Sequence, residues 1–141
     1  MQNLRARIRE VLTQGFLMSL GTVDDGGPWV SDVGYVHDVE LNLYWISRKD
    51  RRHSVALRNN PAVAVSITVS TLEEKDLGLQ IAGVAEELTS PPSIVPDYWK
   101  KRGKKPQRPI TNEHTWYRLK PTKIELIDEA NFAHEKQVLT F

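Results

Sequence analysis

The stretch from residue 41 to residue 67 constrains the fold of this chain more than any other part of the sequence. Residues 41–47 contain Leu, Tyr, Trp and Ile, which favour a pleated, half-buried strand. Residues 62–67 are nearly all apolar, which is typical of a second strand. The segment between them ends at Pro61, because a proline pushes the residue before it out of helical geometry. The stretch therefore predicts a strand, a basic turn, a short helix and a second strand.

The basic turn carries the chemical signal. Asp50 is the expected N-cap of the short helix, because a carboxylate accepts hydrogen bonds from the open N–H groups of a first turn. Arg51, Arg52 and His53 follow it, at a helix end that already carries about half a positive charge. A phosphate would be held there by the N–H groups, the helix dipole and the guanidinium groups together. The alternative is a solvated basic loop whose arginine side chains point into water.

The size and charge of the chain limit what it can bind. Its 141 residues suit a single domain over residues 1–141, and its formal net charge is +1. Residues 48–58 hold five Arg or Lys against one Asp, and residues 100–108 hold six and no acid, so the positive charge is local. Two local basic sites indicate a localised anion and not a long polyanion.

Several classes of site and location are not expected. Cysteine is absent and the four histidines lie far apart in the sequence, so we expect no disulfide, no thiol nucleophile and no metal site. No apolar run approaches the roughly 20 residues of a membrane span, and no secretory leader is recognisable at the N-terminus. We therefore expect a cytoplasmic protein with no membrane partner.

The remaining segments predict further strands and helices. Residues 3–14 place their apolar side chains on one helical face, and Gly15 ends that helix. Strands are expected at residues 16–23, 29–37, 77–88, 115–119 and 123–127, with a hairpin turn at 24–27. Residues 97–102 predict one or two helical turns. The pattern indicates a mainly β fold, an antiparallel barrel of about six strands with flanking helices.

Two residues and one segment have more than one interpretation. Gly34 marks either a bulge or the close approach of a ligand. Gln80 either donates to the edge of a planar ligand or is simply exposed. The basic run Lys100–Arg108 is either a solvated face or a loop that closes over a substrate anion.

The order and spacing of several motifs resemble one known family. The motifs, which together span most of the chain, are Leu43–Ser47, Arg52–His53, Asn59–Val65, Gly78–Glu86 and Pro121–Glu125. The sequence resembles the pyridoxamine 5′-phosphate oxidase-like, FMN-binding split-barrel family. The resemblance implies a split barrel that forms a homodimer, with FMN bound at each of two equivalent subunit interfaces.

The resemblance also implies which residues contact the cofactor. Arg52 and His53 stand where family members place a basic pair on the FMN phosphate, with Arg51 in support. Trp116 is expected either to contact the flavin from the second subunit or to lie in the core. The expected cofactor-binding residues are Ser31, Asp32, Val33, Gly34, Ile46, Ser47, Arg51, Arg52, His53, Gln80 and Trp116.

The implied function is an FMN-dependent oxidoreductase that moves hydride or electrons between flavin and a small-molecule substrate. The flavin carries the hard chemistry, so no catalytic residue is assigned. Vitamin-B6 oxidases of the family often carry Arg at the position of Ser31 and an Arg/His-rich segment near the end of the chain. Here no Arg follows Ile127, so pyridoxamine phosphate is not the expected substrate.

Two alternatives remain open from the sequence. The first keeps the split barrel but places deazaflavin or haem in it. The second is a non-enzymatic module in which Lys100–Arg108 grips an anion such as RNA. Nucleic acid is the less expected partner, because only Tyr98 and Trp99 lie near that run to stack on bases.

Overall fold

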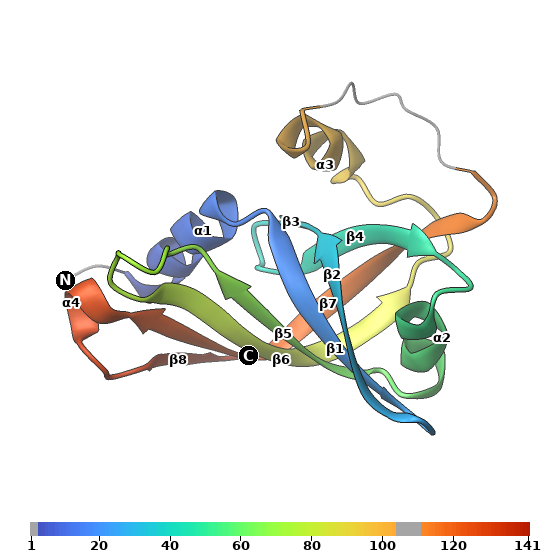
Figure 1. Ribbon diagram of the computed structural model, residues 1–141. Helices are drawn as coiled ribbons and strands as arrows, with labels where there is room; N and C mark the ends of the chain where they lie inside the picture. Colours follow the sequence, from blue (N-terminus) through green and yellow to red (C-terminus); the bar gives the residue numbers. More distant parts are fainter. Residues whose placement is uncertain (1–2, 104–110) are drawn as a thin grey trace.

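The computed structural model describes residues 3–103 and 111–141, which form one antiparallel sheet with helices around it (Figure 1). The helices are α1 (Leu4–Gln14), α2 (Arg52–Asn59), α3 (Val95–Lys101) and α4 (Glu129–Phe132). The strands are β1 (Leu17–Asp24), β2 (Gly27–Gly34), β3 (Val36–His37), β4 (Leu43–Arg48), β5 (Ala62–Thr68), β6 (Leu77–Glu87), β7 (His114–Asp128) and β8 (Gln137–Thr140).

The strands are hydrogen-bonded in the order β2-β1-β5-β6-β7-β4-β3, and β8 also pairs with β7. β7 connects the two parts of the sheet. One of its edges pairs with β6, and the other pairs first with β4 and then with β8. The sheet curls around a core in the manner of a split barrel (Figure 1). The predicted mainly β fold with flanking helices is confirmed.

The described residues contain eight strands, and the predicted boundaries shift at several places. The return strand expected at 29–37 divides at Tyr35 into β2 and β3, whereas the two closing strands merge into β7. β7 tolerates Pro121, which has no N–H to donate, because the register with β6 shifts there. A Cβ at Gly83 would lie 2.5 Å from the carbonyl oxygen of Lys120, so a glycine permits the close approach of the two strands at this bulge.

The first strand of the central stretch begins at Leu43 and not at Leu41. Leu41 has a φ of 70°, the left-handed conformation that a strand does not use. The carboxylate of Asp38 accepts hydrogen bonds from the backbone N–H groups of Glu40 and Asn42, both at 2.9 Å. Residues 41 and 42, which their composition assigned to the strand, therefore belong to this turn.

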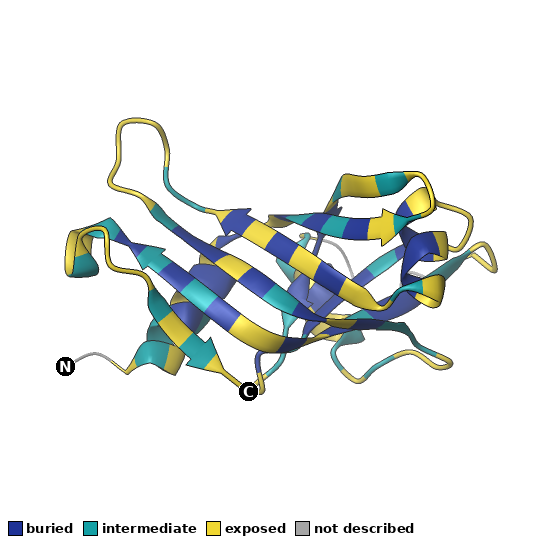
Figure 2. Cartoon of the chain, turned by 90° about the horizontal axis from the view of Figure 1, so that it is seen from below, coloured by how far each residue is buried: buried dark blue, intermediate teal, exposed yellow. Residues whose placement is uncertain are grey.

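Buried and exposed residues alternate along the strands, as Figure 2 shows for the sheet seen from below. In β5, for example, Val63, Val65 and Ile67 enter the main core while the residues between them face outward. α1 covers this core with its apolar face. Within the described residues, no helix is long and apolar enough to span a membrane.

A second, smaller cluster fixes the position of α3. Tyr98 and Trp99 of α3 pack on Trp116 of β7, together with Val36 and Tyr44. The ring centroid of Tyr98 lies 5.1 Å from that of Trp99 and 5.0 Å from that of Trp116, both in edge-to-face geometry. Such aromatic pairs are directional, so they set the orientation of α3 beside β4.

Candidate functional site

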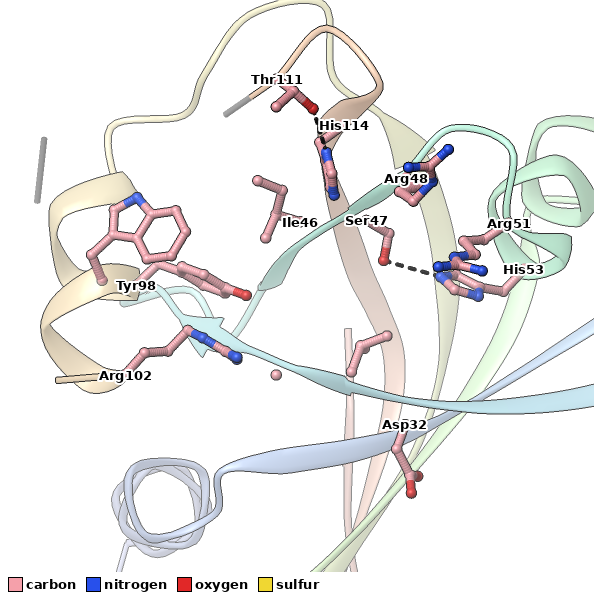
Figure 3. A pocket seen from close by; sticks show the side chains of 13 residues that line it. Asp32, Ile46, Ser47, Arg48, Arg51, His53, Tyr98, Arg102, Thr111 and His114 are labelled. Carbon is pink, nitrogen blue, oxygen red and sulfur yellow. Dashed lines mark hydrogen bonds between the residues drawn. The ribbon is translucent and has the colours of Figure 1, made fainter. Parts of the chain in front are cut away.

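A cavity of about 500 Å³ lies between the end of β2, the end of β4, the start of α2 and the inner face of α3 (Figure 3). Its residues come from segments far apart in the sequence that the sheet brings together. The lining residues are Asp32, Val33, Gly34, Ile46, Ser47, Arg48, Arg51, His53, Tyr98, Trp99, Arg102, Thr111 and His114.

His53 and Ser47 form the α2 end of the cavity. Both side chains are mostly buried, and His53 Nε2 lies 3.0 Å from Ser47 Oγ. Burial, with a smaller effect from the charge of Arg51, holds the pKa of His53 below its usual value of 6.5. The imidazole is therefore neutral at pH 7. An anion beside it would raise its pKa and favour the protonated form.

The predicted N-cap at Asp50 is wrong. Asp50 instead accepts two hydrogen bonds of 3.0 Å from the guanidinium of Arg48, which draws its carboxylate away from the helix. Arg51 occupies the N-cap position, and its side chain makes no capping hydrogen bond. α2 thus begins with cations and without an acidic residue in its first turn.

Two guanidinium groups at the cavity have no acidic partner among the described residues. Arg51 and Arg102 line the cavity, and neither forms a salt bridge with any carboxylate in the part of the chain that the structure describes. Arg48 differs, because it is paired with both Asp50 and Glu113. The carboxylate of Asp32 turns away from the cavity and accepts a 2.7 Å hydrogen bond from Ser19 (Figure 3). The electrostatics of the cavity therefore favour an anionic ligand.

The α3 side of the cavity is aromatic and cationic. The guanidinium of Arg102 lies 5.3 Å from the ring centroid of Phe16 and 5.5 Å from that of Tyr98. It also occupies the space that a Cβ at Gly34 would need. The close approach expected at Gly34 is thus made by a side chain of the same protein.

The neighbouring Lys101 points away from solvent. Its Nζ donates a 3.0 Å hydrogen bond to the carbonyl oxygen of Leu12 in α1 and lies 3.9 Å from the ring centroid of Tyr35. Burial lowers the pKa of Lys101 to about 8. The interpretation of Lys100–Arg108 as a uniformly solvated basic face is therefore wrong for Lys101 and Arg102, because both pack against the body of the protein. Residues 104–108 of this run lie outside the described residues.

The structure brings most of the predicted site residues to one cavity. These are Asp32, Val33, Gly34, Ile46, Ser47, Arg51 and His53. The lining residues that sequence reasoning did not assign are Arg48 at the end of β4, Tyr98 and Trp99 in α3, Arg102 directly after α3, Thr111 before β7, and His114 at the start of β7. Arg48 and Arg102 had a signal, because each belongs to one of the two local basic runs in the sequence.

Four predicted residues lie elsewhere. The guanidinium of Arg52 donates to Asp24, at 2.9 and 3.0 Å, and not into the cavity. Trp116 is buried in the aromatic cluster under α3. Of its two expected positions, contact with the flavin or a place in the core, this is the second. Ser31 pairs with Leu20 and does not line the cavity.

Gln80 lies in a different depression, on the outer face of the sheet. That hollow has a volume of about 430 Å³, and its lining includes Val30 and Val65. The amide oxygen of Gln80 accepts a 2.7 Å hydrogen bond from Lys136. Within one protein chain, Gln80 therefore faces away from the cavity that holds the other predicted residues.

Comparison with known proteins agrees with this architecture. The sequence profile of the family described as pyridoxamine 5′-phosphate oxidase matches residues 4–128. A UPF0306 protein of Pasteurella multocida (strain Pm70) is 30% identical over 89 residues, which are 62% of this chain and 60% of that protein. This chain thus matches less than two thirds of the length of that relative.

Solved structures share the fold at low sequence identity. A haem-binding protein from Mycobacterium smegmatis superposes with a TM-score of 0.73 at 14% identity, covering 99% of this chain and 59% of that one. A FAD-binding protein from Mesorhizobium loti superposes with a TM-score of 0.65 at 19% identity, covering 84% of this chain and 88% of that one. At these identities the likeness shows the fold alone. The match over residues 4–128 shows more: the chain belongs to the pyridoxamine 5′-phosphate oxidase family.

Proposed function

We propose that this protein is an FMN-binding flavoprotein, and that it acts as an oxidoreductase on a small substrate. The observation that carries the proposal is the cavity of about 500 Å³ with two guanidinium groups, Arg51 and Arg102, that form no salt bridge with any described carboxylate. Cofactor pockets commonly enclose about 300–1,000 Å³, so a mononucleotide fits this volume. Membership of the family supports a flavin, and we expect the protein in the cytoplasm.

The residues present fit the two ends of FMN. At the α2 end, Arg51 supplies a charge, Ser47 a hydroxyl and His53 an imidazole whose pKa an adjacent phosphate would raise. Along β2, the backbone from Asp32 to Gly34 lines the cavity and offers N–H and C=O groups to a flat ring. When bound, FMN supplies hydride transfer at its ring. The protein's own part is to orient the ring and to exclude water with the aromatic side chains of α3.

We further propose that the protein is a homodimer, with cofactor at each of two equivalent interfaces. The outer hollow of about 430 Å³ is largely apolar, and Val30 beside it is 63% exposed. A second copy seated there would cover this surface. Gln80 lies in the hollow, so its predicted contact with a cofactor would be made only through the second copy.

Haem is a second candidate ligand, favoured by one specific contact. His114 lines the cavity, and its Nδ1 lies 2.7 Å from Thr111 Oγ1. In the tautomer whose Nδ1–H donates to Thr111, Nε2 is left to ligate iron, and such a partner orients metal-binding histidines in proteins. The resemblance in fold to a haem-binding protein is consistent with this alternative.

A titration separates these ligands. Purified protein is mixed with FMN, a deazaflavin or haem, and binding is followed by absorbance and by fluorescence quenching. We expect one FMN per protomer, bleaching of the bound flavin by a chemical reductant, and a dimer by sedimentation analysis. A protein that retains haem but neither flavin would overturn the proposal, and loss of that haem in His114→Ala would establish the alternative. Retention of deazaflavin alone would keep the fold and change the cofactor.

A further inference from the structure

The first turn of α2 is electrostatically unfavourable as a free helix end. Arg51, Arg52 and His53 follow one another there, the turn has no acidic residue, and the N-cap side chain makes no hydrogen bond to the helix. The partial positive charge of a helix N-terminus repels the guanidinium groups of Arg51 and Arg52, whereas His53 is neutral at pH 7. Something outside the helix must therefore hold the turn in place.

The β1–β2 hairpin holds it through Arg52. The guanidinium of Arg52 makes two hydrogen bonds to the carboxylate of Asp24, from Nε at 2.9 Å and from Nη2 at 3.0 Å. The same guanidinium group lies over the ring of Trp29, with its Cζ atom 4.4 Å from the ring centroid. Figure 1 shows α2 beside the tip of this hairpin. Bidentate pairing fixes the direction of a guanidinium as well as its distance.

The hairpin is shaped to receive this group. The backbone N–H of Gly26 donates a 2.8 Å hydrogen bond to Asp24 Oδ1, which orients the carboxylate. A Cβ at Gly26 would stand 2.9 Å from Arg52 Nη2, so a side chain there would push the guanidinium away. The hydrogen bonds from Arg52 also hold the pKa of Asp24 below its usual range, so the pair stays charged at neutral pH.

The contacts of Asp24 and Trp29 with Arg52, here called the clamp, determine the direction of the neighbouring side chains. Successive residues of an α-helix are rotated by about 100° from one another. With Arg52 held on the hairpin, the side chains of Arg51 and His53 both line the cavity. Release of Arg52 would leave the turn free to rotate or fray, and both groups would lose their fixed direction.

We propose that Asp24 and Trp29 are positioning residues for the anion-binding end of the cavity, and that they act through Arg52. The clamp itself is a property of the chain, while its effect on a phosphate rests on the proposed FMN function. The competing arrangement is the one that family resemblance implies, in which Arg52 leaves Asp24 and binds the phosphate directly. The two arrangements make opposite predictions for one substitution.

The experiment compares Asp24→Asn, Arg52→Gln and the double variant with wild-type protein. FMN and riboflavin, which lacks the phosphate, are titrated into each. Amide hydrogen exchange is measured without ligand at Val55, whose N–H donates to the carbonyl oxygen of Arg51 and so closes the first turn of α2. Glu87→Gln is the matched control, because it removes the ion pair of Arg58 from the opposite end of the same helix, away from the cavity.

We expect Asp24→Asn and Arg52→Gln each to weaken FMN binding about tenfold, and the double variant to be no worse than either, as for groups that act as one unit. Riboflavin affinity should not change, and exchange in the first turn of α2 should accelerate in all three. The two single substitutions alter local charge in opposite directions. Simple charge effects would therefore make FMN binding tighter in Asp24→Asn, whereas the clamp makes it weaker.

Tighter FMN binding in Asp24→Asn would overturn the proposal in favour of direct binding by Arg52. Unchanged exchange in the first turn would also overturn it. If wild-type protein bound no FMN, the proposed function would fail, and the exchange rates alone would decide whether the hairpin fixes the turn. Trp29 is tested in the same way. The substitution Trp29→Leu should accelerate amide hydrogen exchange in the first turn of α2 without altering the charge of the protein.

Discussion

The guanidinium of Arg102 occupies the space that a Cβ at Gly34 would fill, so the side chain of the residue that follows α3 packs directly on the backbone of β2 in the wall of the cavity. At two other glycines an added Cβ would meet the backbone and not a flexible side chain. At Gly78 and Gly83 the added atom would lie 2.5 Å from a backbone carbonyl oxygen, which cannot swing away. The same substitution therefore has different consequences at different glycines.

Gly34→Ala should fold normally and lose cofactor affinity. The group that must move is the end of a flexible side chain, so we expect a melting temperature close to that of wild-type protein. The added methyl group and the displaced Arg102 both enter the cavity, and FMN affinity should fall at least about tenfold, or about 1.4 kcal/mol. Gly83→Ala is the contrasting variant, with an expected loss of about 1–3 kcal/mol in unfolding free energy. Unchanged FMN affinity in Gly34→Ala would contradict the placement of the ring along β2.

Arg51→Gln should weaken FMN binding by about ten- to a hundredfold, because charge-assisted hydrogen bonds contribute about 1.5–3 kcal/mol each. Riboflavin binding should stay the same, since it has no phosphate. Calorimetric titration of both ligands measures the difference. Arg58→Gln is the control on the same helix, because Arg58 pairs with Glu87 outside the cavity. An equal loss for both ligands would place the effect of Arg51 on the ring and not on the phosphate.

The unfolding free energy should fall as the pH decreases from 7 toward 5.5. Burial lowers the pKa of His53 in the folded protein, and burial with the charges of Lys101 and Arg9 lowers that of His37. Below about pH 6.5 the unfolded chain takes up protons that the folded protein refuses, so acid favours unfolding. Urea denaturation at closely spaced pH values measures the slope.

His53→Gln should reduce that slope, and a second substitution, His37→Gln, should reduce it further. His134→Gln is the control, because His134 is exposed. A slope that is the same in wild-type and doubly substituted protein would show that other groups cause the acid sensitivity.

Lys101→Met should remove a stabilisation that appears at alkaline pH. The pKa of Lys101 is about 8 when folded, against 10.5 as the reference value. Above pH 8 the folded protein releases this proton while the unfolded chain keeps it, so the unfolding free energy of wild-type protein should rise toward pH 9.5. Denaturant titrations over this range, below the ionisation of tyrosine, compare the two proteins. A wild-type curve without this rise would refute the assignment.

The fold could be predicted because its strands carry their own pattern. Residues 62–67 and 77–88 show the apolar content of buried strands, and Pro61 marks the end of α2. What composition could not show was the turn at Leu41, which depends on hydrogen bonds to Asp38. Nor could it show that β7 continues through Pro121, next to a bulge in which Thr122 of β7 has no partner in β6.

The candidate site was predictable where it follows from sequence order and not where it depends on side-chain direction. His53 and Ser47 lie on either side of one turn, so their proximity follows from local structure. Arg52 sits between two cavity residues, yet its partner Asp24 is 28 residues earlier, on a hairpin whose position only the folded sheet defines. The contribution of α3 was missed for the same reason, since Tyr98 and Trp99 are placed by tertiary packing on Trp116.

The central position of β7 has a consequence for how the protein is made on the ribosome. β4 lines the cavity, and besides the short strand β3 its hydrogen-bonding partner is the segment His114–Leu119, far along the sequence. β4 leaves the ribosomal tunnel long before that partner is synthesised. The cavity therefore cannot be complete until residues 114–119 have left the ribosome and paired with β4.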